Sequence, residues 1–242
     1  MSARTAPEWL TRWEFAHRGL HSPGVPENSL SAMHAAMKAG MGIECDIQRS
    51  IDNQPMVFHD WELSRLTDGA GLTNVFGADE LEQMMLQESG DRIPRLSILL
   101  AEVSGKVPLL IEIKSRPDYD VEKTCVAVSE ELDGYAGEHA VMSFDPRVGQ
   151  WFAANSPDTV RGLVCTDTLD MGFLSAWREP GALELADPDF LAVDIRDIPN
   201  ALATLWREAG RPVLSWTIRS PDLREKALNE VDALISEGEG LG

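Results

Sequence analysis

Short apolar runs recur along the chain, and longer segments with helical periodicity separate them. The runs are rich in Val, Ile, Leu and Phe and end at Gly, Pro or Asp, so they predict β-strands. Nine strands are expected, at residues 13–17, 42–47, 55–58, 108–113, 140–144, 159–164, 190–194, 213–217 and 232–236. Helices are expected at 29–39, 79–86, 95–103, 145–154, 170–178, 200–209 and 221–230, and from Asp118 or Asp120 to about Leu132.

Strands that alternate with helices predict a mainly parallel sheet. Nine strands over 242 residues fit a TIM (β/α)8 barrel with one extra or split strand. Residues 42–47 and 55–58 have no helix between them, and the Asp52-Asn53 pair favours a turn there. An open doubly wound sheet is the alternative, but it needs a glycine-rich phosphate loop after the first strand, and no G-x-G-x-x-G sequence occurs there.

The chain length fits one domain that spans residues 1–242. Within it, residues 61–95 separate a strand that ends in His-Asp from the next well-defined helix. We expect this segment to be a small insertion in the barrel.

Composition and charge narrow the possible partners. The net charge of −19 argues against nucleic acid, whose phosphates need Lys and Arg for neutralisation. No apolar run reaches the roughly 20 residues of a membrane span. The first residues also lack the apolar core of a signal peptide, so we expect a cytoplasmic protein without an integral membrane segment. The three cysteines lack zinc-type spacing and are expected to be buried thiols.

Ionisable residues gather where the predicted strands end. Alternate residues of a strand face the same side, so Glu44 and Asp46 share one face, as do Glu112 and Lys114. The working face of a TIM barrel lies at the carboxyl ends of its strands. We therefore expect these side chains to converge on one mouth with two histidines that also end strands, His17 and His59.

This group of residues suits chemistry on a phosphate. Three carboxylates repel one another unless a cation compensates them, so Glu44, Asp46 and Glu112 are candidate ligands of one divalent ion. Oxygen ligands favour Mg²⁺ or Ca²⁺, and such an ion polarises phosphoryl oxygens.

Basic side chains complete the predicted chemistry. His17 and His59 titrate near neutrality and can exchange protons with a nucleophile and a leaving group. Arg18 and Lys114 can bind the remaining charge of the phosphate. His21 follows in a loop rich in glycine and proline and is expected to be solvated.

Five motifs together resemble the glycerophosphodiester phosphodiesterase family. They are His17-Arg18-Gly19, Pro26-Glu27-Asn28-Ser29, Gly42-Ile43-Glu44-Cys45-Asp46, Pro55-Met56-Val57-Phe58-His59-Asp60 and Ile111-Glu112-Ile113-Lys114. Trp216-Thr217 is similar to the family's eighth-strand motif, and the resemblance spans about residues 14–236.

The resemblance implies a TIM barrel and metal-dependent hydrolysis of a small-molecule glycerophosphodiester to glycerol 3-phosphate and an alcohol. It implies that His17 and His59 are the general acid and base. It further implies that Glu27 binds the metal or orders the site, and that Trp216 lines the substrate pocket. The insertion at 61–95 matches the place where the family carries one.

The resemblance is incomplete at the end of the last strand. The family often has Ile-Thr-Asp there, whereas this chain has Ile235-Ser236-Glu237, which affects the expected edge of the pocket but not the metal site. Two alternatives to glycerophosphodiester hydrolysis stay open. One is a phospholipase-type phosphodiesterase that acts on lysophospholipid or another small phosphodiester, and the other is a barrel that binds its ligand without turning it over.

Overall fold

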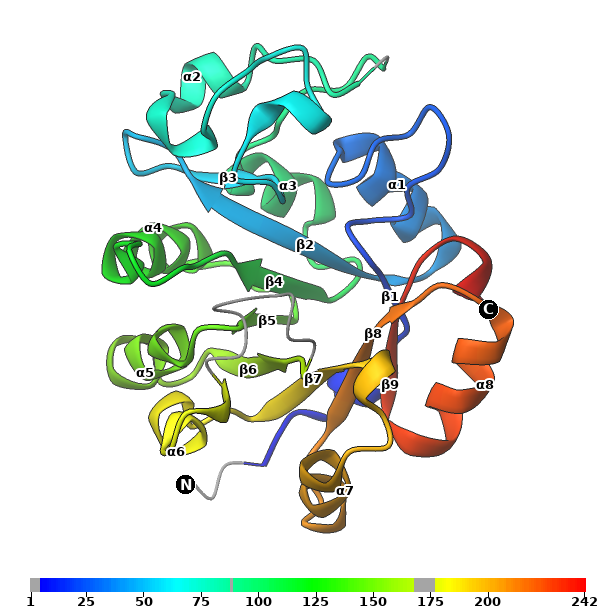
Figure 1. Ribbon diagram of the computed structural model, residues 1–242. Helices are drawn as coiled ribbons and strands as arrows, with labels where there is room; N and C mark the ends of the chain where they lie inside the picture. The colour runs from blue at the N-terminus through cyan, green and yellow to red at the C-terminus, as the bar shows by residue number, and fades with distance from the viewer. Residues whose placement is uncertain (1–4, 88, 168–176) are drawn as a thin grey trace.

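A closed barrel of parallel strands forms the centre of the protein in the computed structural model, which describes residues 5–87, 89–167 and 177–242 (Figure 1). The described strands are β1 (Phe15–Ala16), β2 (Gly42–Arg49), β3 (Pro55–Val57), β4 (Leu109–Ile113), β5 (His139–Ser143), β6 (Val160–Cys165), β7 (Phe190–Asp194), β8 (Val213–Ile218) and β9 (Ala233–Ser236). The predicted TIM barrel is confirmed, and each of the nine predicted strands is present.

The extra strand is β3, which pairs antiparallel with β2 and lies outside the ring. The pairing extends β2 to Arg49, two residues beyond the predicted end. The turn between the two strands places Asn53 at a φ of 62°, a left-handed conformation that asparagine tolerates.

The two ends of the sheet meet at β1, which closes the barrel with only two residues. Phe15 pairs with Gly42 of β2 on one side and with Ile235 of β9 on the other. The first and last strands of the ring therefore lie side by side.

Helices surround the ring of strands (Figure 1). They are α1 (Leu30–Ala39), α2 (Ala78–Leu81), α3 (Leu96–Val103), α4 (Val121–Leu132), α5 (Pro146–Asn155), α6 (Ala182–Ala186), α7 (Ala201–Glu208) and α8 (Pro221–Glu230). Several begin at a residue whose side chain accepts a hydrogen bond from the first turn, as at Ser29 of α1 and Asp120 of α4.

One helix prediction needs correction, and one described helix was not predicted. The helix expected at 79–86 covers only α2, because Met85 and Leu86 pair with other parts of the insertion instead. The short helix α6 was not predicted. The helix expected at 170–178 lies almost entirely outside the described residues.

Successive side chains of each strand point alternately into the barrel and toward the helices. The apolar core therefore has an inner and an outer part. Phe15, Leu110 and Phe190 belong to an apolar cluster that also includes Trp9 and Leu10 from the N-terminal segment. Residues of the opposite parity, such as Cys45 and Ile111, pack with α1, α3 and α4. All three cysteines are free and buried, as expected.

The insertion has a small apolar core of its own, which β3 joins to the main one. Met56 and Phe58 pack with Leu63, Leu81 and other insertion residues, whereas Val57 belongs to the main core. The strand therefore holds the residues after it, including His59, against the barrel.

Within the residues that the structure describes, no helix combines the length and the apolar character needed to cross a bilayer.

Candidate active site

A cavity of about 360 Å³ opens at the carboxyl ends of the barrel strands. Its walls include seven of the residues that the sequence suggested for the site: His17, Arg18, Glu44, His59, Glu112, Lys114 and Trp216. The expected convergence of these strand ends on one mouth is therefore seen.

Three buried carboxylates form one group beside this cavity. Glu44 and Asp46 lie on β2, and Glu112 lies on β4, where it pairs in register with Asp46. One oxygen from each of the three lies within 4.8 Å of the other two. Cys45, between two of them in the sequence, faces the outer core, as the alternation of a strand requires.

Burial and neighbouring charges shift the pKa values of Glu44 and Asp46 in opposite directions. Burial raises the pKa of Glu44 well above its usual value, and the charges of Asp46 and Glu112 raise it further. Burial acts to raise the pKa of Asp46 as well, but the nearby positive charges, that of Lys114 first, lower it overall. Positive charge close to the group is therefore needed to keep all three carboxylates ionised.

Lys114 and Arg18 supply part of that charge. The Nζ atom of Lys114 lies 2.7 Å from Oε1 of Glu112 and 3.3 Å from Oδ1 of Asp46. The Arg18 guanidinium donates to Glu27 at 2.7 Å and lies 3.3 Å from Oδ2 of Asp46. Both cations thus contact the carboxylates and line the cavity, within reach of an anion that enters the mouth.

His59 reaches the cavity from the residues that follow β3. Its Nδ1 atom lies 2.6 Å from Oδ1 of Asp60, and Gln48 of β2 donates to its backbone carbonyl at 3.1 Å. Burial acts to raise the pKa of Asp60, but hydrogen bonds from His59 and Arg65 outweigh it and lower the pKa. Asp60 is therefore an anion that accepts a hydrogen bond from the Nδ1–H group of His59. The other ring nitrogen, Nε2, is not used by this contact.

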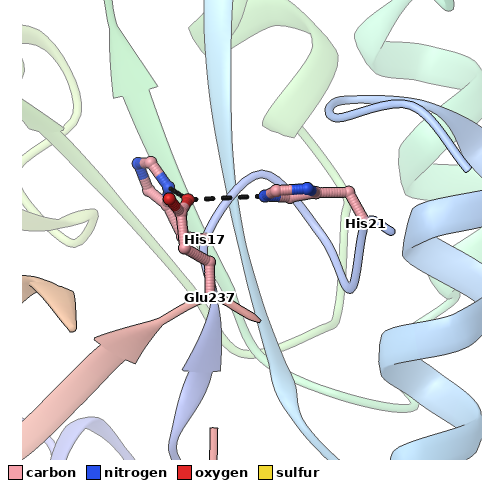
Figure 2. Close-up of side chains that lie close together, drawn as sticks. All are labelled: His17, His21 and Glu237. Carbon is pink, nitrogen blue, oxygen red and sulfur yellow. Dashed lines mark hydrogen bonds and ion pairs between the residues drawn. The ribbon is translucent and has the colours of Figure 1, made fainter. Parts of the chain in front are cut away.

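His17 follows β1 and has a comparable arrangement (Figure 2). Its backbone N–H donates to the carbonyl of Ser236 at 2.9 Å, and its Nδ1 atom lies 2.5 Å from Oε2 of Glu237. Burial lowers the pKa of His17 and outweighs the hydrogen bond with Glu237, which acts to raise it. His17 is therefore a buried, neutral imidazole at neutral pH.

Glu27 and Trp216 occupy separate parts of the site. Glu27 lies outside the group of three carboxylates and accepts hydrogen bonds from Arg18 and Arg65. Trp216 donates from Nε1 to the carbonyl of Ala192 at 3.0 Å and lines the cavity. The contacts of Glu27 suit a residue that orders the site, and the position of Trp216 suits a wall of the pocket.

Sequence reasoning missed four residues that contact the site. Asn28 has no predicted role beyond its place in a motif, yet its side chain donates to Asp46 at 2.9 Å. Asp60 belongs to a predicted motif but had no predicted role in the site. His21 was expected to be solvated, but it is 27% exposed in its side chain and approaches Glu237. Glu237 was noted only as a departure from the family pattern, and that departure was the one available signal.

Comparison with known proteins identifies the family. The profile of the glycerophosphoryl diester phosphodiesterase family matches residues 17–237. YhdW of Bacillus subtilis (strain 168) is 31% identical over 169 residues, which cover 64% of this chain and 67% of YhdW. A glycerophosphodiester phosphodiesterase of Caldanaerobacter subterraneus subsp. tengcongensis is 37% identical over 108 residues, which cover 41% of this chain and 44% of that relative.

A solved structure extends the likeness over nearly the whole chain. An Oleispira antarctica phosphodiesterase, crystallised in complex with the product sn-glycerol-3-phosphate, is 30% identical with a TM-score of 0.80. The match covers 93% of this chain and 92% of that one. The chain therefore belongs to the glycerophosphoryl diester phosphodiesterase family.

Proposed function

We propose that this protein hydrolyses glycerophosphodiesters to glycerol 3-phosphate and an alcohol, with one divalent cation bound by Glu44, Asp46 and Glu112. The observation that carries the proposal is the group of three buried carboxylates, with oxygens within 4.8 Å of one another, beside a cavity that His17 and His59 also line. Membership of the family supports the reaction class. The product complex of the Oleispira antarctica relative supports the choice of glycerol 3-phosphate.

The residues present fit a hard divalent cation. All three candidate ligands offer carboxylate oxygens, which Mg²⁺ and Ca²⁺ prefer. Burial, and then the charges of Asp46 and Glu112, raise the pKa of Glu44, so a bound cation would favour its ionised form. A bound ion would supply Lewis-acid polarisation of a phosphoryl oxygen.

Proton transfer is assigned to the two histidines by their surroundings. His17 is the base that accepts the proton of the nucleophile, because burial keeps its imidazole neutral. His59 is the acid that protonates the departing alcohol, and its contact with Asp60 fixes the orientation of the ring. The nucleophile is water or the glycerol 2-hydroxyl, and the second route gives a cyclic phosphate first.

The remaining residues bind and enclose the substrate. Arg18 and Lys114 hold phosphate oxygens once the substrate enters, since both line the cavity and carry full positive charge. Glu27 orders Arg18 through their 2.7 Å contact. Trp216 forms an apolar wall against the glycerol or the alcohol. The cytoplasmic location stays a prediction from the sequence.

Removal of the metal tests the proposal directly. We expect EDTA to abolish release of glycerol 3-phosphate from glycerophosphocholine, and added Mg²⁺ or Ca²⁺ to restore it. Glu44→Gln should lower kcat by about 10²-fold or more, which is the usual loss when a group that stabilises transition-state charge is removed.

Glu138→Gln is the matched control, because Glu138 is exposed and precedes β5 at the opposite end of the barrel. It should keep full activity. Undiminished turnover in EDTA, with metal-free protein verified by elemental analysis, would contradict the metal site. Separation of products from a panel of diesters, lysophospholipid included, would identify the alcohol.

A further inference from the structure

The carboxylate of Glu237 lies between two imidazoles that come from one loop (Figure 2). Its Oε2 atom is 2.5 Å from Nδ1 of His17 and 3.4 Å from Nε2 of His21. Glu237 directly follows β9, whereas His17 directly follows β1. The contact therefore joins the first strand of the barrel to the last.

Other contacts hold the same carboxylate in place. Arg219 donates from Nε to Oε1 at 2.5 Å, and the backbone N–H of Glu237 donates to the carbonyl of Ile218 at 2.9 Å. Only 18% of the Glu237 side chain is exposed. Three donors from two segments, the loop of His17 and His21 and the residue Arg219, thus fix both oxygens of one largely buried carboxylate.

The contact determines the tautomer of His17. A carboxylate has no proton to donate, so the hydrogen bond between Oε2 and Nδ1 requires the proton on Nδ1. In the neutral ring, Nε2 then carries the lone pair. Since His17 lines the cavity, this is the nitrogen left for the reaction.

We propose that Glu237 is a positioning residue for His17, and that His21 belongs to the same device. Glu237 holds the imidazole in the tautomer and orientation in which Nε2 accepts a proton, and His21 restrains the shared oxygen from the opposite side. This proposal rests on the role of His17 as a base in the proposed function. Asp60 holds Nδ1 of His59 in a comparable way, so each cavity histidine has its own carboxylate.

Activity measurements on three variants test whether Glu237 and His21 position His17. Glu237→Gln should lower kcat about 10- to 100-fold, the size expected for one charge-assisted hydrogen bond, while KM changes little. Glu237→Asp keeps the charge and should retain clearly more activity than the glutamine variant. His21→Gln should lower kcat about threefold to tenfold, because one weaker hydrogen bond is replaced.

Glu102→Gln is the matched control. Glu102 forms a pair of the same kind with His34 at 2.9 Å, but on the exposed surface of α3. It should leave kcat unchanged. A kcat of Glu237→Gln within twofold of the starting protein, with melting temperatures alike, would overturn the proposal.

A measurement that does not depend on catalytic turnover, the tautomer of His17, separates this inference from the proposed function. In ¹⁵N-histidine spectra, with the His17 signals identified by their loss in His17→Asn, the protonated nitrogen should be Nδ1. Glu237→Gln should shift the population toward Nε2–H. If the substrate assignment were wrong, this signature would persist although no protein released glycerol 3-phosphate.

Metal content distinguishes the device from a second metal centre. We expect one divalent ion for each chain, unchanged in His21→Gln. Two ions in the starting protein, one of them lost in that variant, would overturn the proposal, because His17, His21 and Glu237 would then be ligands.

Discussion

At the scale of single residues, the active site contains two pairs of a histidine and a carboxylate. The two residues are neighbours in the sequence in one pair and far apart in the other. Asp60 is next to His59, and the sequence shows both in one motif. Glu237 is 220 positions from His17, so only the closed barrel brings them together. The carboxylates of Glu44 and Asp46 could be placed on one face from strand alternation alone. Long-range partners such as Glu237 follow from tertiary structure, which no local pattern contains.

The pair formed by His59 and Asp60 gives a prediction at this scale. Asp60→Asn should lower kcat about 10- to 100-fold, because the neutral amide stabilises the charged imidazole less well. The KM for glycerophosphocholine should change little. Steady-state kinetics on the metal-loaded protein measure both constants, and Asp79→Asn, an exposed carboxylate of α2, is the control. Equal losses in the two variants would remove the argument for a specific role of Asp60.

At the scale of elements, predictions were correct where the apolar residues of a segment followed a clear pattern. They were wrong where pairing with distant residues determined the local structure. The strands are apolar runs with turn residues at both ends, and each was found near its expected place. The helix expected at 79–86 stops after α2, because Thr67 pairs with Leu86 and Met85 pairs with Arg92. The helix α6 has five residues, too few for a period of 3.6 to be recognised.

Close packing between β6 and β7 gives a prediction for an element. A Cβ atom on Gly162 would lie 2.3 Å from the buried ring of Phe190, which is its partner in register. Gly162→Ala should therefore lower the free energy of unfolding by about 1–3 kcal/mol, the usual cost of overpacking. Urea titration followed by fluorescence measures the change.

Gly90→Ala is the control for this prediction, because a Cβ there would meet nothing within 4 Å. Its effect should stay within about 0.5 kcal/mol, as for most surface changes. If Gly162→Ala were as stable as this control, the ring of Phe190 would have to move freely within the barrel.

At the scale of the whole molecule, the insertion and the barrel share one strand. Residues on one face of β3 pack in the core of the insertion, and Val57 on the other face packs in the main core. The barrel is also closed only through β1, between the first and last parts of the chain. We therefore propose that residues 1–242 unfold as one domain.

Calorimetry tests this proposal. Metal-free protein should show one thermal transition with a calorimetric enthalpy of about 170 kcal/mol, since unfolding absorbs about 0.7 kcal/mol for each residue near 60 °C. The van't Hoff enthalpy should equal it. A separate early transition, absent when residues 61–95 are replaced by a short loop, would show that the insertion unfolds independently.

The closure of the barrel at β1 has a consequence for protein synthesis. A ribosome releases His17 first, and all three carboxylates follow long before Glu237. The nascent polypeptide nevertheless lacks β9 and Glu237 until those residues have been synthesised, so β1 has no neighbour on one side before then. Hydrolysis should therefore begin only after β9 and Glu237 have left the exit tunnel.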